Sequence, residues 1–230
     1  MEQEATGAVI MIGRAGPTAA EQLLGRAIQA AATDLIVALT SLDIRPVIVA
    51  GPELDWLPDE PGCVGDLDEG PFHFGERLAG VVERFGVVHV LYFGAGSAPL
   101  LSREVIAQMR AALLSAGASR ERVALTNNLH SSDWVAFTQA QDALPVIRRA
   151  NRDNSLAWML QEDGGWAVRA LAQLPPSARF DLDTPADLAI VRAHPACSPR
   201  LRMALQYPLL DRIPVGAVLD VLVRDGAGRR

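Results

Sequence analysis

The chain alternates short, wholly apolar runs with long segments of helical periodicity, and this alternation constrains the fold more than any other feature. The runs at 7–13 (GAVIMIG) and 45–51 (RPVIVAG) have the length and character of strands buried on both faces. Between them, residues 18–42 place apolar side chains three and four positions apart, as one face of a helix does. A strand, a helix and a second strand in this order predict a parallel sheet with a right-handed crossover.

The same alternation continues along the rest of the chain. Strands are expected at 87–94, 122–128 and 133–139, and helices at 72–86, 102–115, 154–163 and 184–194. Residues 52–71 interrupt the pattern with proline, glycine and acidic side chains, and we expect a long loop without regular structure there. The sequence therefore predicts an α/β fold, a three-layer α/β/α sandwich around a mostly parallel sheet.

The C-terminal part of the chain differs from the rest. We expect the sandwich to occupy residues 1–195 and a C-terminal helical extension, an arm broken at Pro208 and Pro214, to occupy residues 196–230. Large aliphatic side chains recur along this arm, at Leu201, Leu205, Leu209, Ile213, Val218, Leu219, Leu222 and Val223. A soluble chain seldom leaves so much apolar surface in water. We expect the arm to form a homodimer contact; the alternative is that it folds back on its own domain.

Charge and cysteine content exclude several classes of function. The net charge is −6, so a nucleic-acid partner is not expected. All 21 basic residues are arginine, which leaves no lysine for a Schiff base or a lysine-dependent phosphate site. Cys63 and Cys197 fit neither metal-ligand spacing nor a disulfide framework.

No targeting or membrane segment is expected. The acidic start and the short apolar run at 7–13 do not fit a signal peptide. We expect no apolar segment that approaches the ~18–20 residues of a membrane span. These features predict a soluble, cytoplasmic protein without a membrane partner.

A glycine-containing turn follows the first predicted strand, at the edge where open α/β sheets bind ligands. Gly13 and Gly16 would let the backbone approach a phosphate at a helix N-terminus, and Arg14 would add a positive charge. The motif is neither a dinucleotide-binding fingerprint nor a P-loop. The alternative is a plain turn between strand and helix.

A second such turn, FGAGSAPLL, follows the strand at 87–94. Gly94 and Gly96 leave room for a ligand, and the hydroxyl of Ser97 can donate a hydrogen bond to it. The turn carries no acid to hold a cation. The alternative is a small-residue turn packed under the next helix.

Polar side chains gather between the strands expected at 122–128 and 133–139. Asn127, Asn128, Ser132 and Asp133 could contact a ligand through directional hydrogen bonds, and Asn154 could join them from the polar stretch NRDNS. For the first four the alternative is an ordinary polar loop. For Asn154 it is a helix cap.

The stretch RFDLDTPADL places Asp181 and Asp183 two positions apart, so their side chains leave a short strand on the same face. Asp183 or Thr184 could cap the helix that begins at Pro185. Asp181 is the remaining acid. Its carboxylate could hold Mg²⁺ beside a phosphate.

These pieces together resemble the nucleotidyltransferases of the GT-A-like fold, which include the molybdenum-cofactor and phospholactate guanylyltransferases and related small glycosyltransferase-like proteins. FDLDTPADL looks like the closing D-x-D-T-P-E-D-L of that family, and VLYFGAGSAPLLSREVI looks like its central strand. The resemblance covers residues 7–195. It implies a nucleotide-diphospho-sugar transferase-like fold, a nucleotide or sugar-phosphate ligand, and Mg²⁺ as cofactor.

The chain also departs from the pattern of that family. The aspartate that the resemblance implies as a metal ligand aligns with Ser97, and a hydroxyl cannot replace a carboxylate on Mg²⁺ without a large loss of affinity. The lysine of the first loop is missing, and only Arg14, with Arg26 as a second candidate, could stand in.

Three hypotheses follow for the function. The first is an active nucleotidyl- or glycosyltransferase with a rearranged site, with Arg14 and Asp181 as catalytic residues and a cation on Asp181 and Asp183, or on an acid from 66–69. The second is a catalytically degenerate binding or assembly protein of the same fold. The third is an unrelated Rossmann-like enzyme.

Overall fold

Seven strands form one mixed sheet in the order β3-β2-β1-β4-β6-β5-β7. The computed structural model describes residues 6–171 and 175–216. The strands are β1 (Thr6–Met11), β2 (Val47–Gly51), β3 (Cys63–Leu67), β4 (His89–Gly94), β5 (Val123–Thr126), β6 (Trp134–Phe137) and β7 (Ala167–Ala170). Within the described residues, β6 alone runs antiparallel to its neighbours, β4 and β5.

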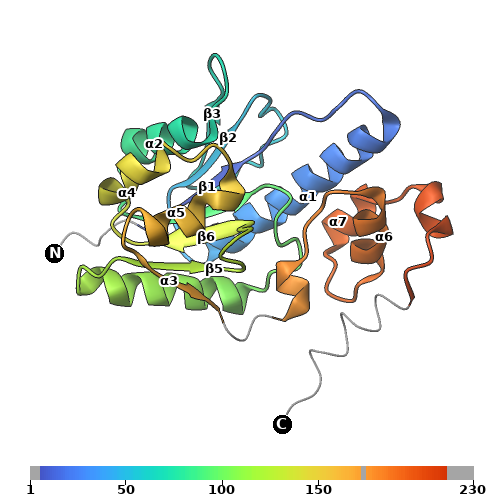
Figure 1. The fold of residues 1–230 in the computed structure, drawn as a ribbon. Helices are drawn as coiled ribbons and strands as arrows, with labels where there is room; N and C mark the ends of the chain where they lie inside the picture. The colour runs from blue at the N-terminus through green and yellow to red at the C-terminus, as the bar shows by residue number, and fades with distance from the viewer. Residues whose placement is uncertain (1–5, 172–174, 217–230) are drawn as a thin grey trace, which may run out of the picture.

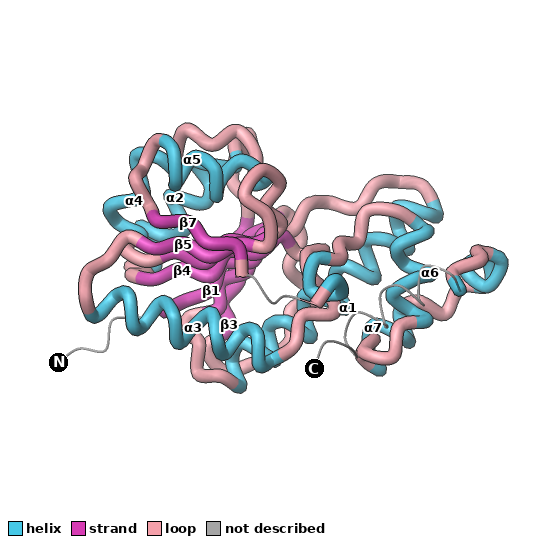
Figure 2. The backbone as a smooth tube through the Cα atoms, turned by 60° about the horizontal axis from the view of Figure 1, so that its bottom comes forward, coloured by secondary structure: helices cyan, strands magenta, loops and turns pink. Residues whose placement is uncertain are grey.

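Helices cover both faces of the sheet (Figures 1 and 2). One face carries α1 (Ala19–Ser41) and α3 (Arg103–Ala118), and the other carries α2 (Phe74–Phe85), α4 (Ala140–Ile147) and α5 (Leu156–Glu162). Helices α6 (Pro185–Ala193) and α7 (Pro199–Ala204) pack beside α1 at one side of the molecule (Figure 1). The predicted three-layer α/β/α sandwich is confirmed.

The central strands β1 and β4 are buried on both faces because their residues are apolar almost throughout. Val9 and Tyr92 pack in the core beneath α2, α4 and α5. Ile10 and Phe93, one position further along each strand, pack in the core beneath α1 and α3. This two-sided burial explains the uninterrupted apolar runs in the sequence.

Residues 52–71 do not form a wholly irregular loop, contrary to our prediction. They contain the edge strand β3, which pairs in parallel with β2. Only Asp66 of this strand is buried, so its sequence, CVGDL, lacks the apolar pattern of a core strand. We also did not predict α4, whose interior holds Pro145, or the short strand β7.

Helix α1 differs from expectation in one respect. Its 23 residues are long and apolar enough to cross a membrane by length and composition, although we expected no such segment. Its side chains at Ala27, Ile36 and Leu39 are fully buried against the sheet and α7 in the described structure. This is the burial pattern of a core helix.

The described part of the C-terminal arm packs on its own domain. Leu201, Leu205 and Leu210 are buried in an apolar cluster with α1 and α6, and Arg200 forms an ion pair with Asp34 of α1. Leu209 is 54% exposed. Ile213 is partly buried against the same cluster, and the last four aliphatic residues that we singled out, Val218, Leu219, Leu222 and Val223, lie outside the described residues. The fold-back alternative therefore accounts for the buried leucines, and the homodimer contact stays a prediction.

This packing predicts unequal effects for two neighbouring side chains of α7. Leu201 is fully buried, so Leu201→Ala should lower the free energy of unfolding by about 2–5 kcal/mol. Met203 is 66% exposed, so Met203→Ala should change it by less than about 0.5 kcal/mol. Urea unfolding of both variants measures the difference. Equal losses would contradict the packing of α7 on α1.

Candidate functional site

A cleft of about 760 Å³ opens at the ends of β1, β2 and β4. Its lining includes Gly13 and Arg14 after β1, Gly94 at the end of β4, and Asp153 from the 3₁₀ helix Asp153–Ser155. Three of the predicted site residues, Gly13, Arg14 and Gly94, thus border one cavity. The position at the carboxyl ends of parallel strands is where open α/β sheets bind ligands.

The turn after β1 divides into an accessible part and a structural part. Arg14 forms an exposed ion pair with Glu53, with 3.0 Å between Nε and Oε1. An exposed pair of this kind is weak enough for an anionic ligand to displace the glutamate. Gly16 instead packs against Glu21, so closely that a Cβ at position 16 would collide with the carboxyl group of that side chain. We therefore assign Gly16 a structural role.

The turn after β4 is held by the chain segment that precedes α6. Ser97 and Asp181 form a one-residue antiparallel bridge, and the N–H of Leu182 donates to the carbonyl of Gly96 at 3.2 Å. A Cβ on Gly96 would lie 3.3 Å from the carbonyl oxygen of Leu182 and 3.5 Å from Asp181 Oδ1. Glycine at this position lets the two segments approach closely.

The bridge places Asp181 among other carboxylates. Burial raises the pKa of Asp181 most, and the negative charges of Asp183, Asp133 and Asp153 add to the rise, which brings the pKa to about 7. The N–H of Leu182, which donates to Asp181 Oδ1 at 2.9 Å, opposes this rise. The four acids therefore form an electrostatically coupled cluster, which we call the carboxylate cluster.

Asp133 is held in the carboxylate cluster by two other predicted residues. Asn127 accepts from the Asp133 N–H at 3.1 Å and donates through its amide to the Asp133 carboxylate. The Ser97 hydroxyl donates to the Asp133 carbonyl at 2.8 Å. Burial raises the pKa of Asp133, the hydrogen bond from Asn127 lowers it, and Asp153 and Asp183 raise it. Asn127 and Ser97 are thus engaged in positioning Asp133.

The other predicted polar residues stabilise the loops around the cleft. The buried Ser132 hydroxyl donates to the carbonyls of Asp153 and Asn154, at 3.1 and 3.2 Å. Asn128 accepts from the N–H of His130 at 3.1 Å. The side chains of Asn128 and Asn154 are exposed, and neither residue lines the cleft.

Sequence reasoning missed several residues of the site, among them Asp153 and Tyr92. Both line the cleft, and the Tyr92 hydroxyl lies 3.4 Å from Asp153 Oδ2. Burial, followed by the charge of Asp153, raises the pKa of Tyr92 well above its ordinary value. The stretch NRDNS pointed to this turn. Nothing in the sequence showed that Asp153, and not Asn154, would face the cleft.

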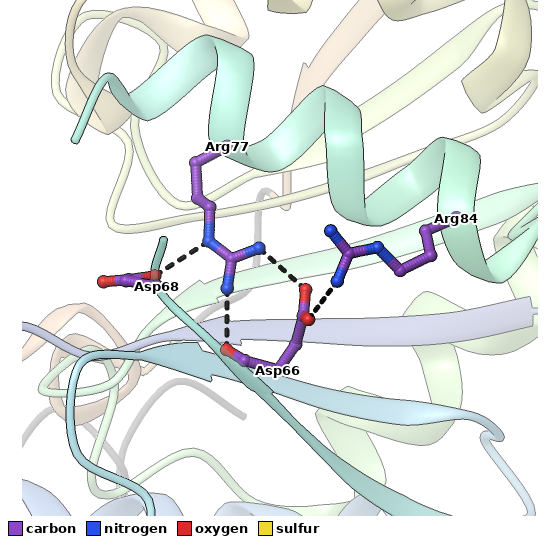
Figure 3. Close-up of polar contacts among 4 residues, drawn as sticks. All are labelled: Asp66, Asp68, Arg77 and Arg84. Atoms are coloured by element: carbon purple, nitrogen blue, oxygen red, sulfur yellow. Dashed lines mark hydrogen bonds and ion pairs between the residues drawn. The ribbon is translucent and has the colours of Figure 1, made fainter. Parts of the chain in front are cut away.

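Asp66 and Asp68, the acids of the 66–69 segment, are bonded to arginines (Figure 3). Arg77 of α2 pairs with Asp66 at 2.7 Å and with Asp68 at 2.8 Å, and Arg84 also pairs with Asp66. Asp66 is only 6% exposed, so its charge would be costly to bury alone, and these bonds offset that cost. Asp66 and Asp68 are therefore poor candidates for a cation site.

The carboxylate cluster fits Mg²⁺ only in part. Carboxylate oxygens are the donors that a hard cation prefers. However, no three His, Cys, Asp or Glu side chains are arranged to hold a metal ion within residues 6–171 and 175–216. Mg²⁺ is often bound by one or two carboxylates, with water and phosphate oxygens as its other ligands. Asp181 and Asp183 could serve in that way.

The fold is shared with known transferases, although no family model and no curated protein matches the chain. A candidate nucleotide-diphospho-sugar transferase from Desulfovibrio desulfuricans is 13% identical, over 90% of this chain and 97% of its own, with a TM-score of 0.61. The 2-C-methyl-D-erythritol 4-phosphate cytidylyltransferase from Thermus thermophilus is 20% identical, over 90% and 100%, with a TM-score of 0.53.

A third match is a CMP:2-keto-3-deoxy-manno-octonic acid synthetase whose structure contains CTP. It is 14% identical, over 88% of this chain and 100% of its own, with a TM-score of 0.50. At such identities these likenesses establish the fold. The chain has the fold of nucleotide-diphospho-sugar transferases and cytidylyltransferases. The narrower resemblance to the molybdenum-cofactor guanylyltransferases stays a prediction.

The start of α6 decides between the two residues that we expected as its cap, Asp183 and Thr184. Thr184 is the N-cap: it accepts from the Asp187 N–H, while the Asp187 carboxylate accepts from the Thr184 N–H at 2.7 Å. Thr184→Ala should therefore lower the free energy of unfolding by about 0.5–2 kcal/mol. Asp183→Ala should leave it unchanged or raise it, because it removes a like charge near Asp181. Thermal unfolding of both variants measures the two effects, and a larger loss in Asp183→Ala would identify Asp183 as the cap.

The raised pKa of Asp181 predicts a pH-dependent effect of Asp181→Asn. Because the folded-state pKa is about 7 and the ordinary value 3.8, ionisation of Asp181 opposes folding increasingly as the pH rises between them. Each pH unit contributes at most about 1.4 kcal/mol, and partial exposure reduces the total to roughly 2 kcal/mol. Asp181→Asn should thus be more stable than the wild type at pH 8 and equal to it at pH 4. A difference that does not vary with pH, measured by urea unfolding, would refute this.

Proposed function

We propose that this protein binds a nucleotide, or a sugar phosphate or other phosphorylated metabolite, in the cleft at the ends of β1, β2 and β4, and that it is a nucleotidyl- or glycosyltransferase with a rearranged site. The observation that carries the proposal is the cleft itself. It is large enough for a nucleotide, at about 760 Å³, and it lies beside the carboxylate cluster.

The lining of the cleft supports an anionic, partly apolar ligand. Arg14 and Arg152 supply positive charge for phosphate groups, and Gly13 and Gly94 keep the backbone accessible between them. Met11, Phe74 and Tyr92 supply apolar surface on the same cavity. A ligand with both a phosphate and a ring system matches this combination.

The proposed cofactor is Mg²⁺, held by Asp181 and Asp183 and completed by phosphate oxygens of the ligand. A cation bound there would neutralise negative charge that develops on a transferred phosphoryl or nucleotidyl group. It would also relieve the mutual repulsion of the carboxylate cluster. In this proposal Asp181 and Arg14 are the catalytic residues, and Asn127 positions Asp133 within the cluster.

A catalytically degenerate binding protein of the same fold is the second candidate. The serine at position 97 favours it, because its hydroxyl is committed to the Asp133 carbonyl and supplies no charge to a cation. Such a protein would bind the same ligands without turnover. Cytoplasmic location, absence of nucleic-acid and membrane partners, and a homodimer remain predictions under either candidate.

Calorimetric titration with CTP and GTP, with and without Mg²⁺, tests the proposal. The wild type should bind at least one of them, and Mg²⁺ should strengthen binding. Asp181→Asn should abolish most of the Mg²⁺ dependence while leaving metal-free binding nearly unchanged. The exposed Asp59 provides the matched control, since Asp59→Asn removes one charge outside the cleft and should behave as wild type.

Two results would count against the proposal. If neither nucleotide binds under either condition, the nucleotide-binding function is refuted. If Asp181→Asn keeps the full Mg²⁺ dependence, the cation lies elsewhere. Release of pyrophosphate from a bound nucleotide in the presence of acceptor sugar phosphates would separate the active from the degenerate candidate.

A further inference from the structure

Phe72 is a large aromatic side chain that the protein leaves in water. It is 63% exposed, and it lies in the loop between β3 and α2. Among the exposed large apolar side chains of the described residues, it is the one that lines the cleft. A phenylalanine in this position can contact a ligand in the cleft, and burial of its ring against that ligand would be favourable.

The loop that carries Phe72 is fixed at its start. Arg77 of α2 donates through Nε to Asp68 at 2.8 Å, and through its two terminal nitrogens to the carboxylate and carbonyl of Asp66 (Figure 3). The side chain of Arg77 is only 13% exposed, so these bonds are shielded from water. Gly70, with φ of 74°, then makes a turn that other residues rarely adopt.

The loop is also fixed at its end. His73 is the N-cap of α2 and accepts from the Glu76 N–H at 3.3 Å. Its other ring nitrogen lies 3.1 Å from the side-chain oxygen of Asn151, which also lines the cleft. With both ends held, Phe72 is presented on an ordered segment, so a ligand that contacts it need not order the loop first.

The surroundings indicate what such a ring would contact. Phe74 and Tyr92 line the same cleft and pack edge to face, with ring centroids 5.4 Å apart. Arg152 and Arg14 supply charge for phosphates in the same cavity. A ligand with a flat aromatic part and an anionic part matches this arrangement. Because every nucleobase has a π-face, stacking on phenylalanine favours bases as a class and tolerates their identity.

We propose that Phe72 is the stacking surface for the base of the nucleotide, and that the Asp66–Arg77–Asp68 ion pairs position the loop that presents it. This inference rests on the proposed function, since it requires a nucleotide in the cleft. In this proposal, a side chain on the β3–α2 loop provides the affinity for the base. It also gives the edge strand β3 a role, because Asp66 and Asp68 anchor that loop.

The test compares nucleotides with inorganic tripolyphosphate, which has the charge but no base. Phe72→Ala should weaken the binding of CTP and of GTP by about 5- to 150-fold, to a similar extent for both. Its affinity for tripolyphosphate should stay within about twofold of the wild-type value. Phe72→Tyr keeps an aromatic ring and should bind like the wild type, whereas Phe72→Leu should resemble Phe72→Ala. Trp158→Ala is the matched control, because Trp158 is 42% exposed on α5 and does not line the cleft.

Each outcome of the calorimetric titrations has a separate meaning. Nucleotide binding by Phe72→Ala at wild-type strength would overturn the stacking role and leave the proposed function standing. An equal loss of affinity for nucleotide and for tripolyphosphate would also overturn the stacking role, because the residue would then act only on loop structure. A wild type that binds no nucleotide would overturn both. A dimer in light scattering that Phe72→Ala dissociates, with nucleotide binding unchanged, would assign the ring to a second copy of the chain.

Discussion

The backbone bridge between Ser97 and Asp181 is the contact on which the rest of the candidate site depends. It joins the turn after β4 to the segment that precedes α6, and the N–H of Ala98 extends it by donating to the carbonyl of Phe180 at 3.0 Å. Because the bridge is made by main-chain atoms, it does not depend on the side chain at position 97. A serine there can therefore replace an acid while the geometry around Asp181 is kept.

The bridge also explains why negative charge gathers beside the cleft. It sets Asp181 next to the start of β6. Because β6 runs antiparallel to β4, the start of β6 lies beside the end of β4. Asp133, which directly precedes β6, therefore lies at the edge of the sheet where β4 ends. Asp153 approaches from a 3₁₀ helix elsewhere in the chain. Repulsion within this group is a cost to folding that a cation or a bound ligand would relieve, which is typical of functional sites and not of structural ion pairs.

Much of the fold followed from the sequence, because buried strands such as β1 and β2 carry a continuous apolar signal. The edge strand β3 did not, since its one buried side chain is an aspartate paired with arginines. In the site, the glycines after β1 and β4 were found from their position alone. Asp153 and Phe72 were missed because their importance arises from tertiary structure. Asp153 matters through its neighbours Tyr92 and Asp133, and Phe72 through the position of its loop, which Arg77 holds.

The absence of lysine has a consequence for how the cleft responds to its surroundings. Arginine keeps its proton at every pH at which proteins fold, so the basic wall of the cleft is electrically constant. The charge of the carboxylate cluster beside the cleft is not constant, because burial and neighbouring charge bring the pKa of Asp181 to about 7. Near neutral pH, the charge around the cleft therefore changes on the side of the carboxylate cluster and stays fixed on the side of the arginines. A ligand whose binding shifts the pKa of Asp181 will bind near neutral pH with uptake or release of a proton, and acidity will then act, in effect, as a co-ligand of this protein.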